Sequence, residues 1–367
     1  MTQFNKLHLS SSPHFKSSWT TQKIMLTVLI CMLPECAAGV YFFGIRALVT
    51  ILTSVASCIL FEALFQIITK QEVVIKNLSA AVTGVLLALV LPSTTPVWMT
   101  VLGAFVAVVI AKGLFGGIGS NVFNPALTGR AVLFISFPAV LGASWLNPQA
   151  DINKWSFAQT SLKNLDAISS ATVLSQIKAG TFQANKDVWL TYLFGNRSGC
   201  IGETAIVLIL LSFLILAAGK IIDWRAPLGM VFTAALATFL ESLIKNHQLV
   251  LAASDVITCL LTGGLLFGAT FMITDYATAP VTKWGRFIFG CGAGLITFLI
   301  RSFGNYPEGV MFSILIMNAI APFLNNITGR KYGYGKKGHR RPQPRKIVQD
   351  FDVKNAKEVT LNEEAAK

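Results

Sequence analysis

Charged residues are scarce in this sequence. They make up 13% of the 367 residues, while 53% are hydrophobic, and the charged share is about half of the ~25% that is typical of soluble domains. A water-soluble globular protein is therefore excluded. Ten strongly apolar stretches follow one another along the chain, most of them near the roughly 20 residues that a helix needs to cross a bilayer. The composition predicts an all-α polytopic membrane protein.

Side chains that bind metal or haem are few or poorly placed. Six cysteines occur, none in a CxxC pair, and five of them lie inside apolar stretches, where cysteine acts as a small hydrophobic residue. Neither a zinc site nor a cysteine-ligated cluster within this chain is indicated, so we expect no bound metal. None of the four histidines lies in the middle of an apolar stretch, which argues against a haem held by paired histidines.

The ten expected membrane segments form two groups of five around a long polar loop. Their ranges are 24–43, 47–69, 77–91, 97–115, 126–143, 203–222, 226–243, 252–271, 284–303 and 308–326. Segment 77–91 is short and ends before a proline, which favours a broken or re-entrant helix that is covered by protein. The first segment resembles a signal peptide, but the 23 residues before it and its internal Pro34-Glu35 favour a retained helix.

The positions of lysine and arginine predict the orientation. With ten crossings both termini share one side, and that side receives 22 of the 30 basic residues, 11 of them from residue 330 onward. The short loops of the other side hold 3, and the long loop holds the remaining 5. Because cytoplasmic loops are enriched in basic residues, we expect a multi-pass protein of the cytoplasmic (inner) membrane with both termini in the cytoplasm.

The expected organisation has five parts. They are a cytoplasmic segment 1–23, a five-helix repeat 24–143, an external loop 144–202, a second five-helix repeat 203–328 and a basic cytoplasmic tail 329–367. We interpret the tail as an anchor to the headgroups of the lipid bilayer rather than a nucleic-acid site; RNA binding is the alternative.

Weak internal similarity suggests that the two halves are repeats. Residues 83–87 resemble 262–266, and the pair 115–117 and 124–126 resembles 303–305 and 318–319. Because each half has an odd number of segments, the second would enter the membrane inverted, as in many transporters. Chance similarity between glycine-rich apolar helices is the alternative.

Two carboxylates fall deep inside expected membrane segments, where a charge is costly unless it is paired or hydrated. Glu35 follows Pro34, and Glu62 shares one helical face with Ser54 and Gln66. Both are candidates for an ion path, and both are equally compatible with a helix cap or a helix contact. Three further carboxylates lie closer to the outer ends of segments: Glu241, Asp255 and Glu308.

The long loop contains the sequence Asp-Ala-Ile-Ser-Ser-Ala-Thr at 166–172. By composition this is an ordinary surface turn or a short capped helix. It resembles the Asp-x-x-Ser-Gly-Ala-Thr signature at which a flavin transferase attaches FMN to threonine through a phosphoester bond. The resemblance implies covalent FMN on Thr172, with Asp166, Ser169, Ser170 and Ala171 forming the rest of the motif. Ser170 stands where the family usually has glycine, and we still expect Thr172 to be modified.

Further stretches extend the resemblance over nearly the whole membrane portion, namely 12–14, 24–25, 78–89, 112–121 and 124–127. Together they resemble the D subunit of the Rnf ion-translocating ferredoxin:NAD oxidoreductase. The short N-terminal region favours this protein over its paralogue, the B subunit of the sodium-pumping NADH:quinone oxidoreductase. The resemblance implies an electron-transfer subunit that works with other membrane and flavoprotein subunits while the complex moves Na⁺ or H⁺. It implies no catalytic residue and no complete activity in this chain alone.

The same resemblance implies a second, noncovalent flavin, riboflavin. The glycine-rich stretch 116–125 contains Asn121 and Asn124, whose amides can bond a flavin edge where glycine permits close approach. A tight turn with asparagine as a helix cap is the alternative. Asp275 is a further candidate for this pocket. From a different class of function, a passive channel or solute transporter on the same plan would need no chromophore.

Overall fold

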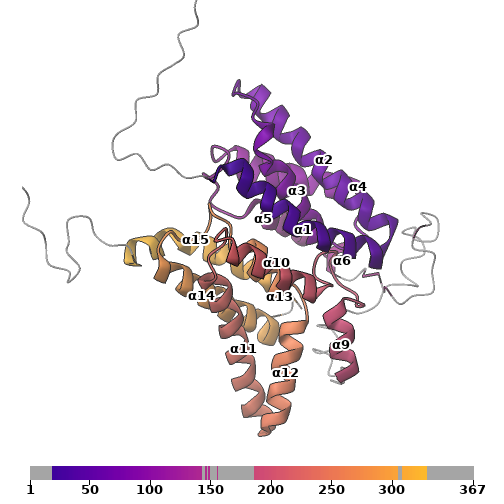
Figure 1. Ribbon diagram of the computed structural model, residues 1–367, viewed down its shortest axis with the longest axis vertical. Helices are drawn as coiled ribbons and strands as arrows, with labels where there is room; N and C mark the ends of the chain where they lie inside the picture. The colour runs from indigo at the N-terminus through magenta and orange to yellow at the C-terminus, as the bar shows by residue number, and fades with distance from the viewer. Residues whose placement is uncertain are drawn as a thin grey trace, which may run out of the picture. The chain divides into compact units, whose positions relative to one another are not determined.

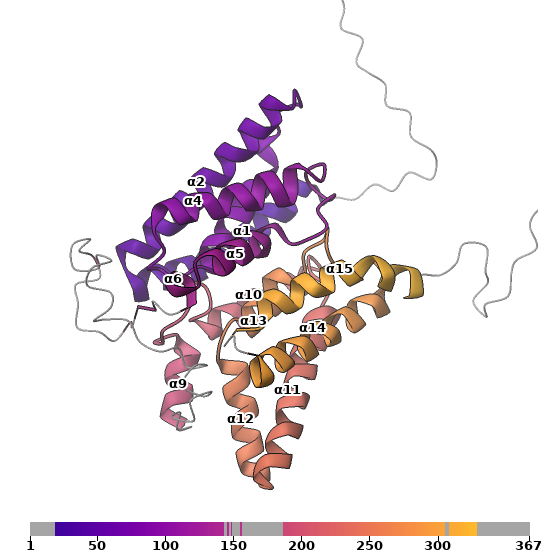
Figure 2. The same ribbon diagram turned by 180° about the vertical axis from the view of Figure 1, so that it is seen from behind.

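The computed structural model describes residues 19–142, 145–146, 148, 155, 186–304 and 308–328. All regular elements within these ranges are helices, so the predicted all-α class is confirmed. The described residues up to Asn326 form one compact unit. In Figures 1 and 2 the helices before the long loop lie together, and those after it form a neighbouring group.

The first group of helices is built around a long hairpin. Gly44, at φ 74°, separates α1 from α2, and this conformation favours glycine. Helix α4 passes directly into the π-helix η2. The elements of this group are α1 (Thr21–Phe43), α2 (Ile45–Ile68), η1 (Ile75–Asn77), α3 (Ser79–Leu89), α4 (Val97–Phe105), η2 (Val106–Gly113), α5 (Pro125–Ser136) and α6 (Pro138–Gly142).

The second group contains two long helices and a sharply bent pair. Glycine at positions 263 and 264 separates α12 from α13, and Gly263 has φ 67°. The elements are α9 (Lys186–Phe194), α10 (Ile206–Ala218), α11 (Arg225–Asn246), α12 (Leu249–Leu261), α13 (Leu265–Phe267), the π-helix η3 (Gly268–Met272), α14 (Lys283–Phe303) and α15 (Val310–Thr328).

Each of the ten predicted segments contains a helix, but the helices differ in length. Four of them, α1, α2, α11 and α14, are long and apolar enough to cross a membrane. The pair α12 with α13–η3, bent by 61°, is either a fifth, broken span or a re-entrant loop. Five other apolar helices are shorter. The polytopic membrane class is therefore supported, and the number ten stays a prediction.

Three predicted segments differ from the structure in their continuity. Segment 126–143 is divided by Pro138 into α5 and α6, because proline has no N–H to continue the helix. Segment 252–271 is bent at its two glycines, and segment 203–222 becomes helical only at Ile206. The breaks before Ile206 and at the two glycines place non-helical backbone inside the protein, whereas the break at Pro138 lies among exposed residues.

Helix α3 is short and covered by protein, as its sequence predicts. Ten of its 11 residues are buried, and so are residues 90–95 that follow it. The carbonyl oxygens of Leu89 and Leu91 accept hydrogen bonds from the amides of Gly202 (2.8 Å) and Ile201 (3.1 Å). Because polar backbone at membrane depth must be satisfied internally, the segment before α10 acts as the cap of α3.

Close helix packing and apolar exposure both fit a membrane protein. A Cβ on Gly290 of α14 would lie 2.1 Å from the carbonyl oxygen of Ala226 in α11, so only glycine permits this approach. On α2, Leu52, Leu60 and Ile67 are each more than half exposed. Exposed leucine and isoleucine along a long helix are suited to lipid rather than to water.

An ion-pair cluster secures the link between α10 and α11. One carboxylate oxygen of Asp223 accepts hydrogen bonds from Arg225 and Arg286, both at 2.9 Å. Burial raises the pKa of Asp223, but the backbone amide of Arg225 and the two guanidinium groups outweigh it and hold that pKa below its ordinary value. Asp223 therefore stays ionised at neutral pH.

Candidate functional site

A cavity lies between the two groups of helices, at the end where α3 begins. Its walls come from α1, α3, η2, the stretch 118–126, α10 and residues 270–277, and it encloses about 890 Å³, part of it open to solvent. Most of the wall is apolar, and the polar groups include Lys112, Asn121, Asn124 and Asp275. We call it the α3 cavity. A largely apolar hollow with a few convergent polar groups is the usual form of a cofactor site.

Asn121 and Asp275, which are 154 residues apart in sequence, meet at this cavity. The Asn121 amide nitrogen is 3.5 Å from an Asp275 carboxylate oxygen and 3.2 Å from the carbonyl oxygen of Phe123. Thr278 donates to the same carboxylate at 3.2 Å. Burial raises the pKa of Asp275, in spite of the hydrogen bonds from Thr278, the Ala277 backbone and Asn121.

Asn124 has two roles in the structure. As the N-cap of α5 its side-chain oxygen accepts from the Leu127 amide at 3.3 Å, and its amide nitrogen donates to the carbonyl oxygen of Met272 at 3.2 Å. The preceding turn has glycine at positive φ at 116, 117 and 119. The tight turn with an asparagine cap, one of the two interpretations of this stretch, is thus present, and the same residues also line the α3 cavity.

Glu62 forms a buried ion pair at the wall of the α3 cavity. The ammonium of Lys112 lies 2.9 Å from one Glu62 oxygen and 2.8 Å from the Ser79 hydroxyl. Both charged side chains are at least 93% buried, and the second Glu62 oxygen has no partner among the described residues. Ser54 of the predicted polar face is also buried, whereas Gln66 is only partly buried and binds the Val74 amide.

The pairing of Lys112 corrects the charge count. Lys112 and Arg130 are counted with the basic residues of the cytoplasmic side, but both are at least 95% buried and belong to ion pairs. The count for the proposed cytoplasmic side falls from 22 to 20. Sequence reasoning missed the partner of Glu62 because Lys112 is 50 residues away, although a lysine inside an apolar segment signals such pairing.

Glu35 lies apart from the α3 cavity. It is 1% exposed, and one of its oxygens accepts from the Ser212 hydroxyl of α10 at 2.7 Å. Its second oxygen has no partner within the described part of the chain. Glu35 and Glu62 are therefore both buried and incompletely satisfied, and Glu35 is not among the residues that line the cavity with Lys112.

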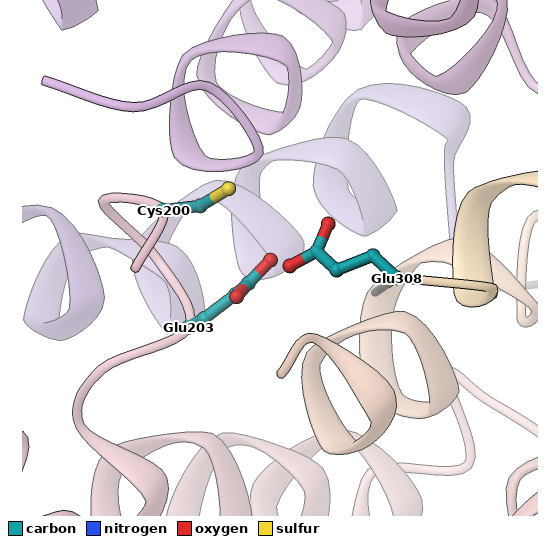
Figure 3. A group of neighbouring side chains, drawn as sticks. All are labelled: Cys200, Glu203 and Glu308. Atoms are coloured by element: carbon teal, nitrogen blue, oxygen red, sulfur yellow. The ribbon is translucent and has the colours of Figure 1, made fainter. Parts of the chain in front are cut away.

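One predicted part of the site lies outside the described residues, and one cluster of side chains was not predicted. The FMN motif, Asp166 to Thr172, lies outside the described residues. A cluster that the sequence did not reveal consists of Cys200, Glu203 and Glu308, whose ligand atoms lie within 4.8 Å of one another (Figure 3). Cys200 and Glu203 are three residues apart, but Glu308 is 105 residues further along the chain, so the three do not form a recognisable ligand motif.

Comparison with known proteins identifies the family. The sequence model of the NQR2, RnfD, RnfE family matches residues 8–333. The chain is 36% identical over 331 residues to the D subunit of the proton-translocating ferredoxin:NAD(+) oxidoreductase complex of Clostridium ljungdahlii, covering 88% of this chain and 95% of that one.

Two further relatives are similar over the same extent. Identity is 37% over 338 residues to the D subunit of the Na(+)-translocating ferredoxin:NAD(+) oxidoreductase complex of Acetobacterium woodii, covering 92% of this chain and 98% of the relative. It is 38% over 355 residues to the D subunit of the ion-translocating oxidoreductase complex of Escherichia coli, covering 89% and 99%. The chain therefore belongs to the NQR2, RnfD, RnfE family.

Proposed function

We propose that this chain is the D-type membrane subunit of an Rnf-type complex, which couples electron transfer between ferredoxin and NAD to the translocation of Na⁺ or H⁺. The observation that carries the proposal is the 36–38% identity, over at least 88% of the chain, to three proteins that are all named as D subunits. These names favour the Rnf-type protein over the B subunit of the NADH:quinone enzyme. Because relatives named for protons and for sodium are equally similar, the ion is left open.

The proposed architecture has ten crossings in two inverted five-helix repeats, with both termini in the cytoplasm and the long loop outside. In support, five helical units meet the length for a span and five shorter apolar helices accompany them. The short helix α3 is covered by protein, which is the condition for a broken helix inside a membrane. The corrected charge count of 20 against 3 favours this orientation.

Covalent FMN on Thr172 is the proposed redox group of the external loop. The support is the motif of Asp166, Ser169, Ala171 and Thr172, in which only Ser170 departs from the family pattern. When bound, a flavin supplies one- and two-electron chemistry, while the protein supplies its position and electrostatic surroundings. A flavin transferase would attach it, and a phosphoester would retain it at an exposed position through repeated turnovers.

The α3 cavity is the proposed site of the noncovalent riboflavin. Its mostly apolar walls with a few convergent polar groups have the usual form of a ligand site. The apolar side chains of α1 and α3 suit a flat aromatic ring, and Asn121, Lys112 and Asp275 offer both donors and an acceptor. Asn121, Asn124 and Asp275 would hold the flavin there.

Glu62 is the proposed ion-path residue nearest to that cavity. Its unpartnered oxygen is the observation in favour, because a buried carboxylate oxygen without a donor is costly. We expect Glu62→Gln to leave both flavins bound and to lower ion uptake per transferred electron in reconstituted vesicles. Glu72→Gln, on an exposed residue after α2, is the control. If Glu62→Gln takes up as many ions per transferred electron as the wild type, Glu62 has no role in the ion path and serves only as the partner of Lys112.

Ultraviolet fluorescence of the denatured chain in a gel tests the proposal, since a covalent flavin survives denaturation. We expect a fluorescent band from cells that contain the flavin transferase, and its loss in Thr172→Ala with normal membrane insertion. Thr181→Ala, in the same loop but outside the motif, is the control that keeps Thr172, and Ser170→Gly is expected to be labelled equally or faster. A dark band in the wild type would favour a channel or solute transporter instead.

A further inference from the structure

Five ionisable or thiol side chains meet in the interior where α3 ends and where α12 is separated from α13. Arg130 comes from α5, and Glu308 lies two residues before α15. The other three, Arg197, Cys200 and Glu203, belong to the segment before α10. Four are at least 95% buried and the Glu308 side chain is 15% exposed. Figure 3 shows the carboxylates of Glu203 and Glu308 turned toward each other, with the Cys200 thiol beside them.

Neither arginine donates to the carboxylate of Glu203. Arg197 donates to the carbonyl oxygens of Leu261 and of Glu203 itself, so it stabilises the backbone at the end of α12. Arg130 donates to one oxygen of Glu308 and lies 3.3 Å from the Cys200 sulfur. The guanidinium groups thus balance the charge of the cluster as a whole and leave Glu203 without a charged donor.

One oxygen of Glu203 is buried and unpartnered. Glu203 is 3% exposed, and its Oε1 has no hydrogen-bond partner among the described residues. A Cβ on Gly264 would lie 2.8 Å from that atom, so the glycine leaves room for it. One carboxylate oxygen of Glu308 and one of Glu203 lie within 4.8 Å of each other. A like charge this close favours the protonated form of one of the two carboxyl groups.

A metal ion fits this cluster less well than a proton. The thiol of Cys200 and the carboxylates of Glu203 and Glu308 are possible ligands, but Arg130 already contacts two of the three groups. A metal would be repelled by that guanidinium at short range and would require the thiolate form of the cysteine. A proton needs only the free lone pair of Glu203 and the nearby negative charge of Glu308.

We propose that Glu203 and Glu308 form a proton-binding pair, in which one proton is held on Oε1 of Glu203 and is stabilised by the negative charge of the nearby Glu308 carboxylate. Uptake adds one proton to the carboxylate and release returns it, with no other bond changed. The other ionisable groups around the pair are Cys200, Arg130, Arg197, and, acting on Arg197 at longer range, Tyr192 and Arg301.

The position of the pair suggests a use in transport. It lies beside the non-helical backbone that ends α3 and the break that follows Leu261, where segments of both halves meet. The role of the pair as a step on the path of the translocated charge rests on the proposed function. The binding of a proton by the pair does not depend on that function.

Infrared difference spectroscopy of the purified complex between acidic and alkaline pH tests the binding. We expect the carbonyl band of a protonated carboxylic acid, sensitive to H₂O/D₂O exchange, which is lost in Glu203→Gln. In Glu308→Gln the band is expected to appear only at lower pH, because removal of a like charge weakens proton binding. Glu241→Gln is the control, since that carboxylate already accepts from Lys245 and Ser302.

Several results would overturn the inference. The first is the absence of the carbonyl band from the wild type, and the second is a band that persists in Glu203→Gln. The third is a stoichiometric bound metal in the wild type that is lost in Glu203→Gln. If Glu203→Gln does not assemble, an unchanged pH midpoint in Glu308→Gln is equally decisive. The transport role is tested by ion uptake per electron in vesicles, which Glu203→Gln should lower at least twofold. Normal uptake with loss of the band would refute that role alone, and in-gel flavin fluorescence tests the proposed function independently.

Discussion

The buried pair of Lys112 and Glu62 allows a quantitative prediction. At 2.9 Å and an effective dielectric constant of about 20, the Coulomb attraction is about 6 kcal/mol. The cost of removing two ions from water is several kcal/mol for each, so the net contribution of the intact pair is small. Removing one partner leaves the other buried charge uncompensated, which costs about 3–5 kcal/mol. Lys112→Met and Glu62→Met are therefore expected to destabilise strongly, whereas the double variant should be close to the wild type.

The assay is a double-mutant cycle on the purified complex. The midpoint of thermal unfolding is measured by size-exclusion chromatography with flavin fluorescence, for the wild type, both single variants and the double variant. The expected order places the wild type and the double variant together, well above both single variants. A double variant whose loss equals the sum of the single losses would show that the two side chains are not coupled, and would refute the reasoning.

Three further predictions concern other parts of the structure. Asn121→Leu should weaken retention of noncovalent flavin about tenfold, as for one lost buried hydrogen bond, measured as the ratio of released to covalent flavin; an unchanged ratio would remove Asn121 from the site. Gly290→Ala should lower the thermal midpoint more than Gly292→Ala, because its Cβ would meet the Ala226 carbonyl at 2.1 Å while that of Gly292 meets only the flexible Met317 side chain; equal effects would contradict this. Asp223→Asn should cost on the order of 1 kcal/mol at pH 7. Because the folded pKa of Asp223 is depressed, its contribution is present above the ordinary aspartate pKa of about 4 and is lost as pH falls below it; a difference from wild type that persists undiminished near pH 3 would contradict the ion-pair account.

The helices could be predicted from the sequence because their signals are local. Each of the ten apolar stretches contains a helix, and the short segment before Pro92 is a short buried helix. The breaks are harder to place, because Pro138 and the pair Gly263-Gly264 are each compatible with a continuous membrane helix until the packing around them is known.

The charged contacts could not be predicted from the sequence. Glu62 and Lys112 are 50 residues apart, and Arg130 and Glu308 are 178 apart. No local pattern links such pairs, so the charge count treats Lys112 and Arg130 as charges of the cytoplasmic side, whereas both pair with carboxylates inside the protein. Asn121, Asn124 and Asp275 line one cavity. The family resemblance indicates the two asparagines, and the aspartate is indicated by its equivalent position at the end of the eighth expected segment.

The most direct test of the central claim measures electron transfer and ion uptake together in vesicles that contain the purified complex. Reduced ferredoxin and NAD⁺ are supplied, and NADH formation and ion uptake are recorded for the wild type and Thr172→Ala. We predict that the wild type shows both activities and that Thr172→Ala, although it assembles, loses both. Ion uptake that continues at the wild-type rate without flavin at Thr172 would contradict the claim that this chain carries electrons for the coupled reaction.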